Sequence, residues 1–301
     1  MKIASKIFSF LLLALFVITC NQKSEPAETI LEGKLKLLVD ESLLPIMTEQ
    51  VEVFESQYNA KVELDAKSES EVIQVLVKDN ARVAILARDL TAQERNRFAS
   101  KKIAPRVTHF ATDAIALIAN KNNKDTIVSL EDIISVMQHK TVPGIKGLVF
   151  DNPNSSTAHY MMKLAGIKQL PSEGVFSFKT NQETIRYVAE NDGMIGVVGL
   201  NWVYNPLASV KPYVDRINIL NVRQHSKNSI SFPSQNDIAE GKYPLARHLY
   251  VVNCQGYSGL GMGFGSFITG EIGQRIVLKS GLVPFKTPSR KILIRKDIEK
   301  K

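Results

Sequence analysis

Four polar residues stand together in the middle of the chain, and their side chains suit the binding of an oxyanion. They follow the apolar run Gly147–Phe150, which predicts a strand, and they precede an apolar segment that predicts a helix. A turn of this composition places hydroxyls and free backbone N–H groups at a helix N-terminus, where the macrodipole favours anions. The alternative is that one of the two serines only caps its own helix. The four residues are Asn154, Ser155, Ser156 and Thr157.

A second interpretation of this turn is a serine hydrolase with Ser156 as the nucleophile. The base would be His159 or His248, oriented by Asp151. The sequence argues against this, because it has no G-x-S-x-G elbow and because a histidine three residues along a helix start does not face the hydroxyl. The glycine-rich run at 259–265 lacks the spacings that hold nucleotide phosphates, and the five histidines lack metal-ligand spacing. We therefore expect a binding protein without catalytic activity, metal or cofactor.

The N-terminus has the pattern of an export signal. Two lysines precede an apolar run at 7–18, which is too short for a comfortable transmembrane helix. The run ends in Val-Ile-Thr-Cys and resembles a bacterial lipobox, with Cys20 as the lipid-modified residue. A plain secretory signal with a chance cysteine is the alternative. We expect residues 1–19 to be a lipoprotein signal peptide and 20–33 a lipid-anchored tether, which places the protein in a bacterial cell envelope, on a membrane rather than through it.

Charge and cysteine usage fit an exported binding protein. Removal of the signal peptide deletes two lysines and no acid, so the net charge falls from +8 to about +6. This balance suits anionic partners, but the basic residues are spread along the chain without interleaved aromatics, which argues against nucleic acid. Only Cys20 and Cys254 are present. Cys254 follows an apolar strand and is expected to be a buried thiol.

The first part of the chain alternates strands and helices. Apolar strands are expected at 34–39, 61–64 and 83–86, and each is followed by a polar loop and a helix. Thr91 and Glu94 form a capping box for the third of these helices. In sheets that are built this way, ligands bind in the loops at the C-terminal ends of the strands.

Two long strands far apart in the sequence indicate a bilobed protein. The first, at 104–120, is apolar with Asp113 in its middle, and the second runs from 243 to 252. Each could pass between two lobes, so that the middle of the chain is inserted into one lobe. We expect an α/β fold with lobes at 34–112 plus 245–301 and at 113–244, each a mixed sheet flanked by helices. The other expectations are caps at Ser129 and Asn181, a strand at 193–199, a loop at 221–243 and a glycine-rich loop at 256–265 before the last helix.

In this order and at these spacings, several short segments resemble one family. The chain is similar, over most of residues 34–285, to the phosphate-binding component of bacterial phosphate ABC importers, in the type II periplasmic binding protein superfamily. The turn stands where that family has G-S-G-T. The other matching segments are 84–90, 112–116, 195–197, 243–245, 273–277 and 281–284.

The resemblance implies a cleft between two lobes that close over the ligand. By position it assigns anion contacts to Ser42 and Ser70 in the first two loops, to Arg88 at a strand end, and to Ser155 and Thr157 in the turn. It implies inorganic phosphate or a similar oxyanion as ligand, the subunits of an ABC permease as partners, and a monomer. A protein of the same fold could instead carry an organic ligand as a sensor, in which case Trp202 and Tyr204 are the aromatic candidates.

The departures from the family concern charge. The family usually has an arginine just before the turn, where this chain has Asp151, and an aspartate where this chain has Arg82. The first loop also carries Asp40 and Glu41, where small or hydroxyl residues are common. One hypothesis is a charge exchange, in which Arg82 binds the anion and Asp151 acts as acceptor or ion-pair partner. The other is that Arg82 is a solvated surface residue.

Overall fold

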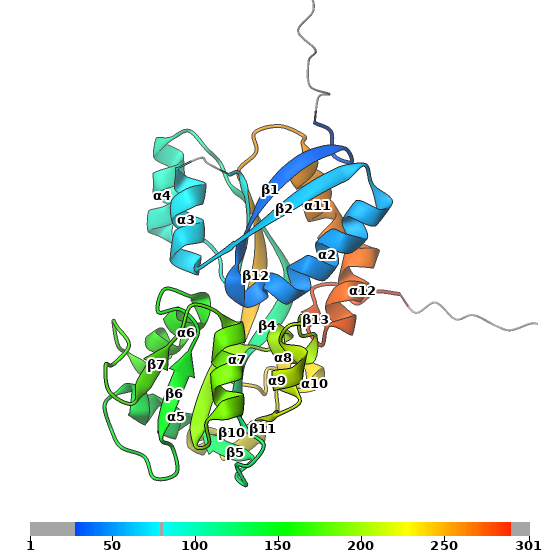
Figure 1. Cartoon of the computed structure of the whole chain (residues 1–301). Coiled ribbons are helices and arrows are strands. Elements are labelled where there is room, and N and C mark those ends of the chain that lie inside the picture. Colours follow the sequence, from blue (N-terminus) through cyan, green and yellow to red (C-terminus); the bar gives the residue numbers. More distant parts are fainter. Residues whose placement is uncertain (1–27, 79–80, 290–301) are drawn as a thin grey trace, which may run out of the picture.

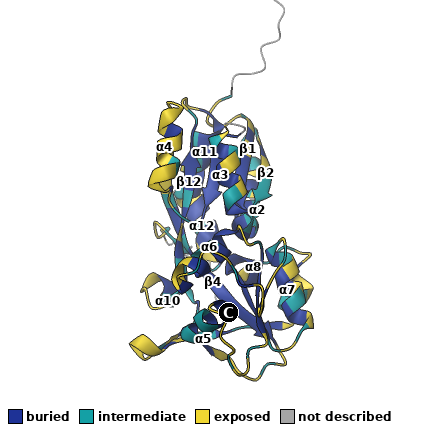
Figure 2. Ribbon diagram, turned by 90° about the vertical axis from the view of Figure 1, so that its left-hand side faces the viewer, coloured by how far each residue is buried: buried dark blue, intermediate teal, exposed yellow. Residues whose placement is uncertain are grey.

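The computed structural model describes residues 28–78 and 81–289. The expected signal peptide and the lipidation at Cys20 lie outside the described residues. Figure 1 shows two lobes, one above the other, joined where two segments of the chain pass between them. Figure 2 shows that most strands near the middle of the sheet are buried, whereas the edge strand β2 (Ala60–Lys67) and the outer faces of several helices are partly exposed. None of the helices within the described residues is long and apolar enough to cross a membrane.

The upper lobe, lobe I, is built on three parallel strands that end at one edge. β1 (Gly33–Asp40) lies between β2 (Ala60–Lys67) and β3 (Val83–Leu86). Since the strands are parallel, the loops after them meet at the edge that faces the lower lobe (Figure 1). The helical elements that follow these strands are η1 (Glu41–Leu43), α2 (Leu44–Gln57), α3 (Glu69–Val77) and α4 (Ala92–Ser100).

The two lobes share one long strand, β4 (Arg106–Asn120). Its first part pairs with β12 (Ala246–Asn253) as far as Ala114, and its second part pairs with β8 (Met194–Gly199) from Ile115 onward. The strand order is β2-β1-β3-β12-β4-β8-β6-β7. We therefore propose that the lobes divide near Ala114 and Ala246, within two residues of the expected boundaries.

The lower lobe, lobe II, continues the sheet and adds a smaller one. β6 (Gly147–Phe150) lies parallel to β8 and to β7 (Val175–Ser177). Residues 221–243, expected to be a loop, instead form two strands, a 3₁₀ turn and a short helix, because β10 pairs with two other strands. The remaining elements of this lobe are β5 (Ile127–Ser129), α5 (Leu130–Met137), α6 (Ser156–Ala165), α7 (Asn181–Glu190), α8 (Asn201–Tyr204), α9 (Lys211–Val214), β9 (Ile217–Ile219), β10 (Asn221–Gln224), η2 (His225–Lys227), β11 (Ser229–Ser231) and α10 (Gln235–Ala239).

Two of the three expected helix caps are confirmed. The Thr91 hydroxyl accepts from the Glu94 N–H in the capping box of α4, and Ser129 caps α5. The expected cap at Asn181 is wrong, because α7 begins at Asn181 itself and Thr180 supplies the cap. Asn181 thereby turns its amide into the junction between the lobes.

The glycine-rich run near the C-terminus is mostly helix rather than loop. α11 (Leu260–Thr269) includes three of these glycines, and α12 (Glu271–Lys279) and β13 (Val283–Pro284) follow. A Cβ on Gly263 would lie 1.6 Å from the Ile30 carbonyl oxygen, and one on Gly261 would lie 2.4 Å from a Val83 methyl. These positions therefore need glycine because the helix packs closely against neighbouring segments of lobe I. The amino-acid composition alone does not show that the run is packed in this way. Cys254 is buried, as expected.

Candidate functional site

The lobes meet where the loop after β1 contacts the turn before α6. The Ser42 hydroxyl of lobe I lies 3.1 Å from the Ser156 hydroxyl of lobe II. Nearby, the Ser70 N–H donates to the Asn154 carbonyl at 3.3 Å. The Asn201 amide holds the Ser42 carbonyl from the lobe II side at 2.7 Å. The structure thus brings together four of the residues that the sequence assigned to the site, although Ser70 and Asn154 meet through backbone atoms.

Within the turn, the neighbouring hydroxyls have different partners. Ser155 caps α6, since its oxygen accepts from the Ala158 N–H at 3.1 Å, and it donates to the Asp151 carboxylate at 2.6 Å. The capping interpretation therefore holds for Ser155. Ser156 and Thr157 lie in the first turn of the helix, are buried, and point instead at a guanidinium.

That guanidinium belongs to Arg247 of β12, a residue that the sequence analysis did not assign to the site. It is 4% exposed and donates to Ser156 at 2.8 Å, to Thr157 at 3.4 Å and to Ser42 at 3.1 Å. On its other side, two of its nitrogens contact one carboxylate oxygen of Asp113, at 2.8 and 3.1 Å. One cationic side chain therefore joins hydroxyls of both lobes to a buried acid on the shared strand.

A sequence signal for this pair exists, but it needs the strand register. Arg247 and Asp113 are direct partners across antiparallel β12 and β4. Each is a charged residue in a largely apolar strand, where burying a charge is costly unless it is paired. The two strands are more than a hundred residues apart, so the pairing could not be deduced from either strand alone.

Four carboxyl groups gather at this junction. Burial raises the pKa of Asp40, against the opposing effect of Arg247. Burial also raises the pKa of Asp151 to about 7, and the Asp40 carboxyl adds to that rise. The pKa of Glu41 rises to about 8, mainly through burial and then through Asp151. Among the described residues, no group donates to Asp40 Oδ2 or to Asp113 Oδ1.

Asn181 links these acids to the sheet of lobe II. Its amide nitrogen donates to Glu41 at 2.6 Å and to Asp151 at 3.0 Å, and its oxygen accepts from the Gly199 N–H at 3.0 Å. The Trp202 indole donates to the Glu41 carbonyl and is 2% exposed, so it packs beneath the loop. Tyr204 is 43% exposed. We find no aromatic platform from this pair.

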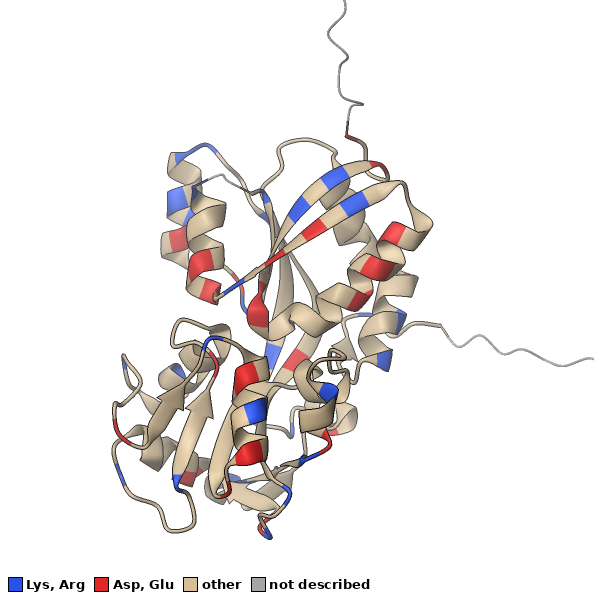
Figure 3. Cartoon of the chain, in the orientation of Figure 1, with Lys and Arg blue, Asp and Glu red and all other residues tan. Residues whose placement is uncertain are grey.

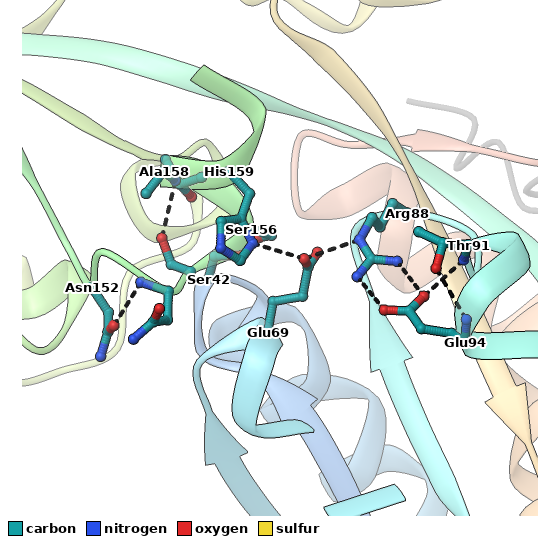
Figure 4. A network of polar contacts seen from close by, with 12 residues as sticks. Ser42, Glu69, Arg88, Thr91, Glu94, Asn152, Ser156, Ala158 and His159 are labelled. Atoms are coloured by element: carbon teal, nitrogen blue, oxygen red, sulfur yellow. Dashed lines mark hydrogen bonds and ion pairs between the residues drawn. The ribbon is translucent and has the colours of Figure 1, made fainter. Parts of the chain in front are cut away.

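A second arginine lies near the edge of the junction. Arg88 donates to Glu69 at 3.0 Å and binds Glu94 with two nitrogens at 2.9 Å each. The same Glu69 oxygen lies 3.0 Å from the His159 ring nitrogen of lobe II. Figure 4 shows Glu69 between His159 and Arg88. This chain of contacts connects the lobes, and Arg88 is neutralised by two carboxylates within it.

The structure does not bring Arg82 to the turn, so the expected charge exchange with Asp151 lacks the contact it needs. Arg82 immediately precedes β3 and Arg88 follows it, so the two lie at opposite ends of the strand. Six residues of extended chain span about 20 Å. The arginine that stands beside the turn is Arg247, which takes the place that the hypothesis gave to Arg82.

The geometry does not assemble a hydrolase. His159 contacts Glu69, and His248 contacts the Thr112 hydroxyl, so neither ring is bonded to Ser156 in the described structure. Within the described residues there is also no group of three or more His, Cys, Asp or Glu residues that could hold a metal ion. What the junction offers is a cation and several hydroxyls as donors, together with carboxyl oxygens as acceptors.

Known proteins resemble this chain in sequence and in fold. Residues 24–271 match the PBP superfamily domain. The "Phosphate-binding protein PstS" of Borreliella burgdorferi is 27% identical over 246 residues, which cover 76% of this chain and 81% of the relative.

Solved structures agree on the fold. One described as a phosphate ABC transporter substrate-binding protein of Clostridium perfringens, with bound phosphate, superposes with a TM-score of 0.69 at 19% identity, covering 84% of this chain and all of the other. An ABC-type phosphate transport receptor of Vibrio cholerae gives a TM-score of 0.62 at 15% identity with the same coverage.

Proposed function

The chain belongs to the PBP superfamily, and from this we propose that it captures inorganic phosphate between its lobes and delivers it to the permease of an ABC importer. The names of the PstS relative and of the phosphate-bound structural neighbour support this ligand. The observation that carries the proposal is the buried Arg247 guanidinium, which reaches hydroxyls of both lobes. In this role the protein has no chemistry of its own.

Arg247 and the hydroxyls supply the donors for the anion. A buried guanidinium forms strong charge-assisted hydrogen bonds with phosphate oxygens and can contact two of them at once. In this structure the hydroxyls of Ser42, Ser156 and Thr157 accept hydrogen bonds from Arg247, and those of Ser42 and Ser156 also contact each other. When the lobes separate, water replaces these contacts between neutral hydroxyls and the guanidinium. When the lobes close over phosphate, its charged oxygens take their place and form stronger hydrogen bonds.

The carboxyl groups supply acceptors, which an anion with its own hydroxyl groups can use. Asp40 Oδ2 has no donor among the described residues, and a P–OH group would satisfy it. Sulfate is fully ionised at neutral pH and cannot donate, so it would meet an unrelieved carboxylate. This surplus of acids over one guanidinium also favours the second candidate, an organic ligand with hydroxyl or amino donors of its own, such as a phosphate monoester of a polyol, bound by the same fold as a sensor or carrier.

The site residues predicted from the sequence are proposed with revised roles. Ser42, Ser156 and Thr157 bind the anion directly with Arg247. Ser155 and Asp151 shape the turn. Ser70, Asn154 and Arg88 hold the lobes at the mouth of the junction.

We also propose the location that the N-terminal pattern indicates. The lipid on Cys20 would keep the chain on a membrane of the bacterial envelope, on the periplasmic side or at the cell surface, as a monomer within reach of the permease. What supports this is the apolar run at 7–18 followed by the lipobox-like end.

The test is calorimetric titration of the full chain in detergent with phosphate, sulfate, molybdate and a phosphate monoester. We expect tight binding of phosphate and weak binding of sulfate. A higher affinity for the monoester would establish the second candidate instead. If none of the four anions binds, the proposed function is overturned, although the fold is unaffected.

A further inference from the structure

A basic pocket lies at the end of lobe I that is distant from lobe II. It has a volume of about 470 Å³ and is lined by Arg82, Lys102 and Arg106, together with the loop that contains Tyr257 and Ser258. The three basic residues come from the segments before β3, after α4 and at the start of β4. Neither Lys102 nor Arg106 forms an ion pair with a described residue, and both are exposed.

An apolar groove adjoins this pocket. It has a volume of about 370 Å³ and is lined by Ile30, Leu31, Met262 and Ile272, among others. Ile30, Leu31 and Ile272 are each more than 40% exposed. Met262 lines both the groove and the basic pocket, so the two are continuous across the start of α11. We call the combined region the tether-end surface.

The described chain begins on this surface and is held to it. The Glu28 carboxylate accepts from the Leu260 N–H at 2.6 Å and from the Tyr257 hydroxyl at 2.9 Å. Cys20 precedes Glu28 by eight residues, and eight residues of fully extended chain span at most about 28 Å. An anchor on Cys20 would therefore keep this end of lobe I closest to the membrane.

The acids of the tether-end surface are already engaged. Glu28 has the two donors named above, and Glu271 in the groove is bound by Arg275 and Ser289. Figure 3 shows basic residues at the upper end of α4 and the loop beside it, whereas acids lie lower on α3 and α4, toward the junction. The basic pocket has no Asp or Glu among its described lining residues, so its charge is positive, and Met262 joins it to the apolar groove.

We propose that the tether-end surface docks on an anionic phospholipid bilayer. The basic pocket receives the phosphate of a lipid headgroup, and the exposed Ile30, Leu31 and Ile272 side chains enter the boundary between headgroups and acyl chains. This is the combination of apolar area and positive charge that binds anionic membrane interfaces. Docking turns the tether-end surface of lobe I toward the lipid and limits the orientations that the anchored protein adopts.

Hydrogen–deuterium exchange on the full chain reconstituted in vesicles tests this. Phosphatidylcholine vesicles are compared with vesicles that also contain phosphatidylglycerol. We expect the amides of residues 101–106 and 256–262 to exchange more slowly only with phosphatidylglycerol, and to lose this protection at high salt. A basic residue near anionic lipid changes the docking equilibrium roughly fivefold, so Lys102→Gln with Arg106→Gln should weaken it about 30-fold.

The matched control is Lys121→Gln with Lys140→Gln, which removes the same charge from exposed positions of lobe II. It should leave the protection intact. Equal protection in phosphatidylcholine alone, or no protection in either vesicle, would overturn the proposal. So would protection of the same amides by inorganic phosphate without phosphatidylglycerol, because the pocket would then be a site for a soluble anion.

Discussion

Two arginines lie near the junction between the lobes, and their surroundings differ. The Arg88 side chain is 34% exposed, and its nitrogens are taken by the Glu69 and Glu94 carboxylates and by a backbone carbonyl. Arg247 is buried and shares one carboxylate, while its other contacts go to neutral hydroxyls.

We propose that this difference separates a structural cation, Arg88, from a cation that binds the ligand, Arg247. A carboxylate partner competes strongly with an incoming anion, because it neutralises the guanidinium and would be repelled by the ligand. A hydroxyl partner does not neutralise the guanidinium and is not repelled by the ligand, because the hydroxyl can rotate and donate a hydrogen bond to the same anion. The residue that matches the family by position, Arg88, is thus the less available of the two.

The largest expected effect comes from breaking the buried pair. Asp113→Ala removes the ion-pair partner of the buried Arg247 guanidinium, and we expect the free energy of unfolding to fall by about 3–5 kcal/mol. Glu69→Gln keeps the shape of the side chain and leaves Arg88 paired with Glu94, so it should cost about 1 kcal/mol or less. Denaturant unfolding of the ligand-free protein measures both. If both variants lost the same free energy of unfolding, the surroundings of Arg88 and Arg247 would not differ in the way proposed.

The next effect is on ligand affinity. Arg247→Lys keeps the charge but cannot bridge the acid and the hydroxyls at once, and we expect phosphate affinity to fall by about 100-fold, since hydrogen bonds to charged groups contribute about 1.5–3 kcal/mol each. Arg88→Lys should change the affinity by less than about tenfold. Calorimetry with phosphate compares them. The reverse ranking would make Arg88 the binding residue.

Substitutions of Ser155 and Thr157 in the turn test whether a structural residue can be separated from a binding residue. Ser155→Ala removes the cap of α6 and should lower the free energy of unfolding by about 1 kcal/mol. Thr157→Val keeps the shape but removes a donor, and should lower phosphate affinity by about tenfold with little change in stability. Thermal unfolding and calorimetry on both variants check this. If Thr157→Val lost stability and Ser155→Ala did not, Thr157 rather than Ser155 would be the residue that caps α6.

A fourth effect is the dependence of stability on pH. Asp151 and Glu41 have pKa values of about 7 and 8 in the folded protein, above their ordinary values of 3.8 and 4.5. The folded state therefore binds protons more tightly than the unfolded chain, so this part of the stability is lost as pH rises from about 4 to about 8. Asp151→Asn should flatten that decline. An unchanged pH profile of thermal unfolding would show that Asp151 does not carry it.

Much of the framework was predictable from local sequence, because local rules decide it. The β-loop-α repeats of lobe I, the cap at Thr91 and the strand-turn-helix around Ser155 follow from apolar periodicity and capping chemistry. The same rules fail where long-range packing decides, as at Gly263, which sits in a helix because Ile30 passes beside it.

The centre of the site was not predictable in this way. Arg247 stands in a strand whose sequence shows a charge but not the acid that it faces. The position of Arg82 could have been questioned from sequence, because it precedes its strand and ligands gather at the other end. The resemblance to a family assigns an anion contact to Arg88, whereas its ion pairs with Glu69 and Glu94 appear only in the fold.

The most direct test is the crystal structure of the chain grown with phosphate. We expect one phosphate between the lobes, with its oxygens about 2.8 Å from Arg247 nitrogens and within hydrogen-bond distance of the Ser42, Ser156 and Thr157 hydroxyls. A phosphate bound to Arg88 instead, with Arg247 still bonded only to Asp113 and the hydroxyls, would contradict the account.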